Sequence, residues 1–201
     1  MSFPKVTGIV LAAGQGSRMG QAKLLLPFRG STILECVVDS ALESSLDRVI
    51  VVLGHHTGDL EPQLKGRDVT VVINPLFESG QSSSLRAGLR AAGGGTGAVL
   101  FLLGDQPLIT PGTINTILRA YQASPASPIV LPVFDGRRGN PVLFGRHTFS
   151  RIEKLSGDQG ARSLFEEYAG HILQVPAADR SIHFDVDTEE DYRLLLEHEG
   201  R

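Results

Sequence analysis

Short runs of consecutive apolar residues recur along the chain and are separated by stretches with helical spacing. Because these runs are apolar at successive positions rather than at every second one, they predict strands that are buried on both faces. The runs that we interpret as strands are Gly8–Leu11, Arg48–Leu53, Val69–Ile73, Ala98–Leu103, Ile129–Val133 and Pro141–Phe144. Such strands alternating with helices indicate an α/β protein with a doubly wound, mostly parallel sheet of Rossmann-like type.

The clearest helical pattern lies at Thr32–Ser45, where apolar side chains recur three and four positions apart. Thr32 and Glu35 have the spacing of a capping box, in which each side chain accepts a hydrogen bond from the other residue's backbone amide. Thr188 and Asp191 repeat this spacing near the end of the chain. Each pair predicts the residue at which a helix begins.

The alternation changes after the fifth predicted strand. Two polar, glycine-rich segments follow, DGRRGN at 135–140 and GDQGAR at 157–162, and a helical stretch separates them. The chain then returns to the sheet through a further predicted strand at Ile182–Val186. We therefore interpret residues 1–201 as a single domain, in which residues 134–180 form an insertion beside the sheet that could hold a second substrate.

Composition excludes several classes of partner. The formal net charge is -3, with 41% hydrophobic and 20% charged residues, so the chain lacks a global basic surplus to hold nucleic acid or anionic lipid. No apolar run approaches the roughly 20 residues that span a bilayer, and we expect a cytoplasmic protein. Cys36 is the only cysteine, which excludes an internal disulfide and a zinc site built from several cysteines.

A glycine-rich loop, LAAGQGSRMGQAKLLLP at Leu11–Pro27, follows the first predicted strand. Ligands of parallel α/β sheets bind at the carboxyl ends of the strands, and small residues in such a loop let a phosphate reach the backbone amides. Arg18 and Lys23 add positive charge. The loop matches neither a P-loop nor the dinucleotide fingerprint. By itself it is equally compatible with phosphate binding and with a turn that carries two solvated cations.

Two carboxylates are predicted at the same edge of the sheet. Asp105 follows the strand Ala98–Leu103 in the sequence GDQP, and Asp187 lies with Asp185 in FDVDTEED, after the late predicted strand. Carboxylates that converge beside a phosphate-binding loop suit a hard divalent ion such as Mg²⁺, for which we favour Asp187 over Asp185 as the second ligand. Singly, Asp105 could be a turn residue and Asp187 the edge of a helix cap.

Two adjacent histidines, His55 and His56, follow the second predicted strand. Neighbouring residues on an extended segment point in opposite directions, so this pair is poorly placed to bind one metal ion together. We interpret both as surface residues or as residues that support the site from outside it.

The motifs LAAGxGSRMGxxKLLLP, SGQSSSLRAGL at 79–89, GDQP and DVDT together resemble those of the molybdenum cofactor nucleotidyltransferases. These are MobA-like NTP transferases with a GT-A-like fold, of the nucleotide-diphospho-sugar transferase type. The resemblance extends from about Gly8 to Asp191. Members with LAAG at the first loop typically use CTP, whereas those with LAGG typically use GTP. Ala13 therefore points to the cytidylyltransferase branch.

The resemblance implies a role for each matching residue. Lys23, Arg18 and Asp105 would be catalytic, the first two by neutralising the triphosphate, and Asp105 and Asp187 would hold Mg²⁺. Gly80 and Ser84 would read the pyrimidine edge. The implied nucleotide-binding residues are Leu11, Ala12, Ala13, Gly14, Gly16, Lys23, Gly80, Ser84 and Asp105.

The implied reaction transfers CMP from CTP to the terminal phosphate of molybdopterin or molybdenum cofactor and releases pyrophosphate. Because that phosphate is already ionised at neutral pH, the reaction needs no general base. The implied acceptor contacts are Arg137, Arg138, Asn140 and Arg162. Many relatives carry His in place of Asn140, and Arg137 and Arg138 are equally compatible with a solvated loop.

Other functions stay open at this point. The enzyme could use GTP or another phosphorylated acceptor, such as a sugar phosphate, or the chain could be a non-catalytic carrier or insertion chaperone for the cofactor. A molybdenum hydroxylase would then be the partner that receives the cofactor. The presence of both Asp105 and Asp187 favours an enzyme, because a carrier has no need of a metal ion beside the α-phosphate.

Overall fold

The computed structural model describes residues 3–14 and 23–198 and leaves 1–2, 15–22 and 199–201 outside the description. The main strands are β1 (Val6–Ala12), β4 (Arg48–Leu53), β5 (Thr70–Ile73), β6 (Ala98–Leu103), β7 (Ile129–Phe134), β8 (Arg137–Arg138), β9 (Val142–Gly145) and β10 (Ile172–Pro176). They form one eight-stranded sheet in the order β10-β7-β9-β6-β1-β4-β5, with β8 paired to β7. Two short strands, β2 (Pro27–Phe28) and β3 (Ser31–Thr32), form a separate hairpin.

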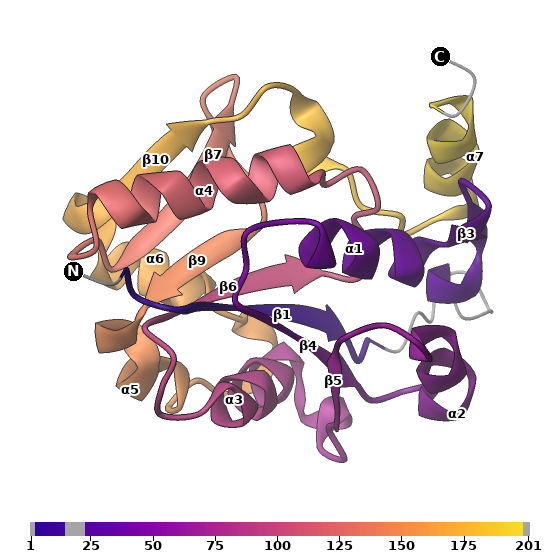
Figure 1. Ribbon diagram of the computed structural model, residues 1–201, viewed down its shortest axis with the longest axis horizontal. Coiled ribbons are helices and arrows are strands. Elements are labelled where there is room, and N and C mark those ends of the chain that lie inside the picture. Colours follow the sequence, from indigo (N-terminus) through magenta and orange to yellow (C-terminus); the bar gives the residue numbers. More distant parts are fainter. Residues whose placement is uncertain (1–2, 15–22, 199–201) are drawn as a thin grey trace.

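Helices cover both faces of this sheet (Figure 1). The α-helices are α1 (Ile33–Leu42), α2 (Thr57–Leu60), α3 (Gln81–Ala92), α4 (Pro111–Ala123), α5 (Phe149–Ile152), α6 (Arg162–Glu167) and α7 (Glu189–Glu197). Short 3-10 turns lie at η1 (Lys23–Leu25), η2 (Glu61–Leu64), η3 (Phe77–Ser79), η4 (Arg146–Thr148), η5 (Gly157–Gln159), η6 (Ala169–His171) and η7 (Arg180–His183). In the described part of the chain, no helix has the length and apolar character needed to cross a membrane.

Successive residues of β1 pack into two different cores. Val10 belongs to the core beneath α1 and α4, whereas Ile9 belongs to the core beneath α3 and α5. Strands β4 and β6 pair in parallel with β1 on its two sides, and β5 continues the parallel arrangement. The predicted doubly wound, mostly parallel α/β fold is therefore confirmed.

The second half of the sheet contains two strands, β8 and β9, that run against the others. Asp135 and Gly136 have positive φ values of 50° and 71°, which is the backbone of a tight hairpin turn between β7 and β8. The chain reverses there, and β9 enters antiparallel to both β6 and β7. Residues 134–180 thus supply strands to the sheet as well as α5 and α6.

The predicted strand at Ile182–Val186 is wrong. The 3-10 turn η7 occupies its first part, and the following residues run extended without a sheet partner in the described structure. Ile182 and Val186 are nevertheless buried in the core beneath α1 and α4. An unpaired extended segment with buried apolar residues has the same sequence pattern as a strand. The pattern reports which residues are buried and does not report whether the backbone pairs with a neighbouring strand.

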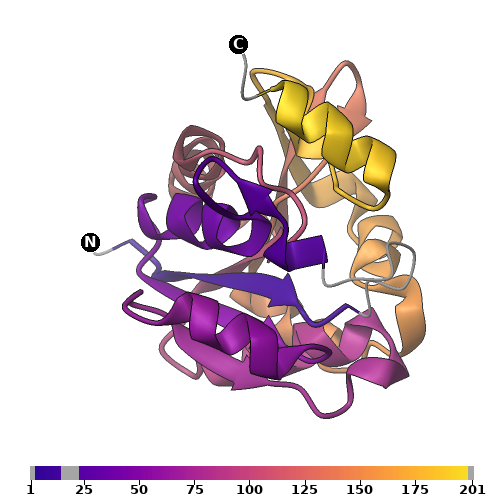
Figure 2. The ribbon, with the colours of Figure 1, turned by 90° about the vertical axis from the view of Figure 1, so that its right-hand side faces the viewer.

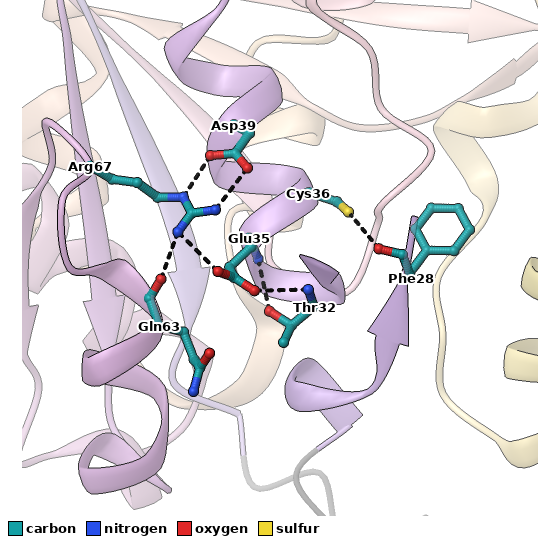
Figure 3. Close-up of polar contacts among 7 residues, drawn as sticks. All are labelled: Phe28, Thr32, Glu35, Cys36, Asp39, Gln63 and Arg67. Carbon is teal, nitrogen blue, oxygen red and sulfur yellow. Dashed lines mark hydrogen bonds and ion pairs between the residues drawn. The ribbon is translucent and has the colours of Figure 1, made fainter. Parts of the chain in front are cut away.

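Helix α1 begins as predicted at a capping box (Figure 3). Glu35 N donates to Thr32 Oγ1 (3.3 Å), and Thr32 N donates to Glu35 Oε2 (2.8 Å). The other carboxylate oxygen of Glu35 accepts from Arg67 Nη1 (2.9 Å), and Arg67 also forms a bidentate pair with Asp39. Burial raises the pKa of Glu35, but the Thr32 hydrogen bonds and the Arg67 charge outweigh it and hold the pKa below its ordinary value. The second predicted capping box, at the start of α7, is also present.

Candidate active site

The parallel register brings the ends of three strands together. Leu11 of β1 lies opposite Val52 of β4 and Leu103 of β6, so the segments that follow these strands share one rim, which faces the viewer in Figure 2. Gly104 N donates to Leu11 O at 3.0 Å. A Cβ at Gly104 would lie only 3.0 Å from that oxygen, so glycine allows the β6 loop to pass close beside the glycine-rich loop.

Asp105 and Asp187 meet at this rim around the ammonium group of Lys23. Lys23 Nζ lies 2.7 Å from Asp105 Oδ2 and 2.7 Å from Asp187 Oδ1. The Lys23 side chain is only 14% exposed, against 23% for Asp105 and 39% for Asp187. Three residues that are far apart in the sequence therefore form one partly buried charged cluster beside the end of β1.

Backbone hydrogen bonds fix the position of Asp187. Val186 N donates to Asp105 O (3.0 Å), which joins the two acidic segments directly. Asp187 N donates to the Asp191 carboxylate (3.2 Å), which also caps α7. Tyr192 then donates its hydroxyl proton to the Pro27 carbonyl oxygen (2.8 Å). The start of α7 is thus held by hydrogen bonds both to the segment after β6 and to the hairpin strand β2.

The cluster carries more negative than positive charge. Burial has the largest effect on Lys23 and lowers its pKa, but the Asp105 and Asp187 carboxylates together outweigh burial and leave the pKa above its ordinary value. Burial, followed by repulsion from Asp105 and Asp187, raises the pKa of Asp185. The single ammonium group thus does not neutralise the negative charge of these carboxylates, and the remaining charge favours binding of a further cation.

The oxygens of this cluster fit a hard divalent cation. Asp105 Oδ1 is buried and has no hydrogen-bond partner in the described part of the chain, so it can accept a metal ion without losing a bond. Within residues 3–14 and 23–198, no group of three or more His, Cys, Asp and Glu side chains could hold a metal ion. A cation at Asp105 and Asp187 would therefore need further oxygen ligands from water or a bound phosphate, as is usual for Mg²⁺.

Two of the predicted acceptor residues, Asn140 and Arg162, line one pocket with Leu11. This pocket of about 110 Å³ is otherwise mainly apolar, and the other residues that line it are Gln81, Leu85, Phe101, Leu103, Val142, Phe144, Ala161 and Phe165. The guanidinium carbon of Arg138 lies 5.9 Å from the centre of the Phe165 ring. Apolar and aromatic walls with a few polar groups are typical of small-molecule sites.

Arg137 lies elsewhere. It lines a separate pocket of about 380 Å³ between η7 and α7, together with residues such as Arg180 and His198. Successive side chains of a strand point to opposite faces, which explains why β8 sends Arg137 and Arg138 in different directions. The structure thus separates Arg137 from the other three predicted acceptor residues.

Gly80 lies where the start of α3 meets the segment at 157–162. Its φ is +100°, and an added Cβ would lie 2.5 Å from the carbonyl carbon of Gly157, so only glycine fits there. Ser84 is only 6% exposed, and its Oγ accepts from Asn74 Nδ2 (3.0 Å). The Ser84 oxygen is thus an acceptor in a buried hydrogen-bond network with Asn74. Gly16 and Arg18, which are also predicted site residues, lie outside the described residues.

His56 lies beside the charged cluster around Lys23, whereas the sequence interpretation placed it at the surface or in support of the site from outside it. It lines a pocket of about 40 Å³ with Leu11, Gly14, Lys23 and Asp105, as well as Leu24 and Leu60. The sequence signal that could have found it is its position directly after β4. Because β4 pairs in parallel with β1, the residues after β4 lie beside the loop that follows β1.

The sequence is similar to those of several known proteins. A sequence profile described as the MobA-like NTP transferase domain matches residues 8–172. The chain is 32% identical to nicotine blue oxidoreductase of Paenarthrobacter nicotinovorans, covering 96% of this chain and 98% of that protein. It is 33% identical to purine catabolism protein PucB of Bacillus subtilis (97% and 98%), and 27% identical to molybdenum cofactor cytidylyltransferase of Escherichia coli (92% and 92%).

Solved structures show the same fold. Rv0371c of Mycobacterium tuberculosis superposes with a TM-score of 0.88 at 31% identity, covering 98% of this chain and 100% of that chain. A complex of Rv0371c with manganese gives a TM-score of 0.81 at 30% identity (96% and 98%). A nucleotidyl transferase of Methanothermobacter thermautotroptrophicus gives 0.82 at 29% identity (96% and 97%). Structural neighbours thus include a nucleotidyltransferase and a protein solved with a divalent metal.

Proposed function

The chain belongs to the MobA-like NTP transferase family, and from this premise we propose that it transfers CMP from CTP to the terminal phosphate of molybdopterin or molybdenum cofactor. The observation that carries the proposal is the meeting of Asp105 and Asp187 around Lys23, beside the end of β1. Nucleotidyl transfer needs such a cluster, because negative charge builds up on the phosphates as the reaction proceeds.

The reaction exchanges one phosphorus–oxygen bond for another. A terminal phosphate oxygen of the acceptor bonds to the α-phosphorus of CTP, while the bond from that phosphorus to the bridging oxygen breaks. Pyrophosphate leaves with the electron pair of the broken bond. The residues of this chain therefore have to align the two substrates and neutralise charge, without forming a covalent intermediate.

Each part of the rim has a task in this scheme. The loop at Leu11–Gly14 would receive the nucleotide, with Gly16 and Arg18 continuing it. Lys23, which its carboxylate neighbours keep protonated, would neutralise the triphosphate. Asp105 and Asp187 would hold a Mg²⁺ ion, which when bound supplies charge neutralisation on the phosphate oxygens.

The acceptor would occupy the pocket that contains Asn140 and Arg162. Its aromatic walls suit a flat heterocycle, and Arg162 suits an anionic group, since a guanidinium recognises phosphate with paired hydrogen bonds. Residues 134–180 would then form the acceptor side of a single nucleotidyltransferase domain. A molybdenum hydroxylase would be the partner that receives the product.

Base preference and turnover test this proposal separately. In the first experiment, CTP, GTP, ATP and UTP with Mg²⁺ are compared for protection against thermal unfolding, because a ligand that binds the native state raises the melting temperature. We expect CTP to raise the melting temperature most. A larger increase with GTP would contradict cytidylyl transfer and indicate guanylyl transfer instead.

The second experiment measures pyrophosphate release. We expect release only when CTP, Mg²⁺ and the cofactor are all present. Release with a sugar phosphate in place of the cofactor would identify a different acceptor. A folded preparation that binds the cofactor but releases no pyrophosphate with any of the four nucleotides would identify a carrier instead of an enzyme.

A further inference from the structure

The turn that follows β4 lies against the glycine-rich loop. Leu53, the last residue of β4, pairs with Ala12, the last residue of β1, so the two chains leave the sheet side by side. A Cβ at Gly54 would lie 2.9 Å from the Ala13 Cβ and 2.6 Å from the Phe77 Cβ. Gly54 therefore lets the turn pack directly against the loop that we assign to the nucleotide.

His56 takes up an unfavourable backbone conformation in this turn. Its φ and ψ are 56° and 24°, in the left-handed region, where the Cβ of most residues crowds the backbone and where glycine is favoured. The turn is well fixed, because Thr57 Oγ1 donates to Gly54 O (2.7 Å) and the amides of Asp59 and Leu60 both donate to His56 O (3.0 Å). The backbone alone would favour glycine at this position.

The polar contacts of the imidazole within the turn are weak. His56 Nδ1 lies 3.7 Å from Asp59 Oδ2, beyond hydrogen-bond distance, and the Asp59 side chain is 67% exposed. The His56 side chain itself is 33% exposed. Backbone strain of this kind is common at ligand sites. The conformation lowers stability there, but it places the side chain where it can bind the ligand.

His56 lines the pocket that Lys23, Asp105 and Gly14 also line. We propose that His56 contacts the nucleotide, by donating a ring N–H hydrogen bond to a phosphate oxygen of the triphosphate beside Lys23. This inference rests on the proposed function. A phosphate oxygen fits because an imidazole always carries at least one N–H donor, whichever its protonation state, and the Lys23 ammonium group is a second donor in the same pocket.

His55 provides the matched control. Its ring contacts that of His56 and packs against Phe77, with ring centroids 4.0 Å and 5.7 Å apart respectively. It has the same chemistry as His56, one position earlier in the same turn, and it does not have a left-handed backbone.

The experiment compares His56→Gly with His55→Gly. Each purified variant is titrated calorimetrically with CTP, GTP and cytidine in Mg²⁺, without an acceptor so that no turnover occurs, and its melting temperature is recorded. For His56→Gly we expect about tenfold weaker binding of the preferred triphosphate, unchanged binding of cytidine, and an unchanged or higher melting temperature. His55→Gly should bind the triphosphate like the wild type.

The outcomes separate this inference from the proposed function. If the wild-type protein binds neither triphosphate, the proposed function fails. If the wild type binds a triphosphate and His56→Gly binds it equally well, the contact does not exist. Equal weakening for CTP and cytidine would place His56 at the nucleoside and overturn the assignment to phosphate, and equal weakening in both variants would show a general effect of the turn. Loss of binding together with a lower melting temperature would show a structural role instead.

Discussion

At the scale of single residues, the rim is organised around one ammonium group. Lys23 makes ion pairs of 2.7 Å with both Asp105 and Asp187. Asp185 adds a third carboxylate, whose pKa is raised by burial and then by repulsion from Asp105 and Asp187. One buried Asp105 oxygen has no partner within the described residues. An arrangement with this excess of acceptor oxygens is suited to binding cations and less suited to adding stability.

We expect Asp105→Asn to separate catalysis from folding. The substitution keeps the size of the side chain and leaves the Lys23–Asp187 pair in place, but it removes the charge that would hold the metal ion. Pyrophosphate release should fall by at least about 100-fold, with only a small change in the free energy of unfolding. Asp68→Asn, at an exposed position, is the control. Full activity in Asp105→Asn would exclude Asp105 from the mechanism.

At the scale of elements, local sequence signals decide where the helices begin. Glu35 serves the start of α1 twice, because one carboxylate oxygen completes the capping box and the other accepts from Arg67. Arg67 also donates to both carboxylate oxygens of Asp39 and to the Gln63 carbonyl oxygen, so the cluster attaches α1 to the segment after η2 (Figure 3). Helix α7 uses the same kind of box to hold the segment that carries Asp187.

Glu35 should make stability depend on pH. Because its pKa in the folded protein lies below the ordinary value of 4.5, its contribution is complete above that value and disappears as the pH falls through the folded pKa. We expect Glu35→Gln to lower the free energy of unfolding at pH 7 by about 1–2 kcal/mol. The difference from wild type should shrink in acid.

Urea denaturation at pH 7 and at lower pH values measures this effect. Glu43→Gln, at the exposed other end of α1, is the matched control and should show neither the loss at pH 7 nor the pH dependence. A loss for Glu35→Gln that is the same at every pH would mean that the carboxylate charge is unimportant.

At the scale of the whole molecule, α3 attaches residues 134–180, which we propose as the acceptor side, to the rest of the protein. Ser82 Oγ donates to Gly157 O (2.7 Å), and Arg86 Nη1 donates to Leu155 O (2.9 Å). Gly80 allows the close approach at this contact. Residues 134–180 are thus joined to the rest of the protein both by their strands and by this contact, which lies beside the pocket lined by Asn140 and Arg162.

Gly80→Ala should loosen this contact. The new methyl group would overlap Gly157, and alanine is strained at a φ of +100°, so we expect a loss of about 1–3 kcal/mol in the free energy of unfolding. Hydrogen exchange of residues 155–162 should become faster. Gly58→Ala is the control, because its Cβ would meet no atom within 4 Å. Unchanged exchange in Gly80→Ala would mean that the contact does not hold the acceptor side in place.

The sequence by itself determined the α/β class, the capping boxes and the rim at which Asp105 and Asp187 meet. Those features follow from short-range periodicity and from the rule that parallel strands end at a common edge. The tertiary structure alone decided that Ile182–Val186 has no sheet partner among the described residues, that Arg137 lines one pocket while Arg138 lies over the Phe165 ring, that Ser84 accepts a hydrogen bond from Asn74, and that His56 lines a pocket with Lys23. The reason is physical: the direction of a side chain depends on neighbours that are distant in the chain, and a local pattern contains no information about them.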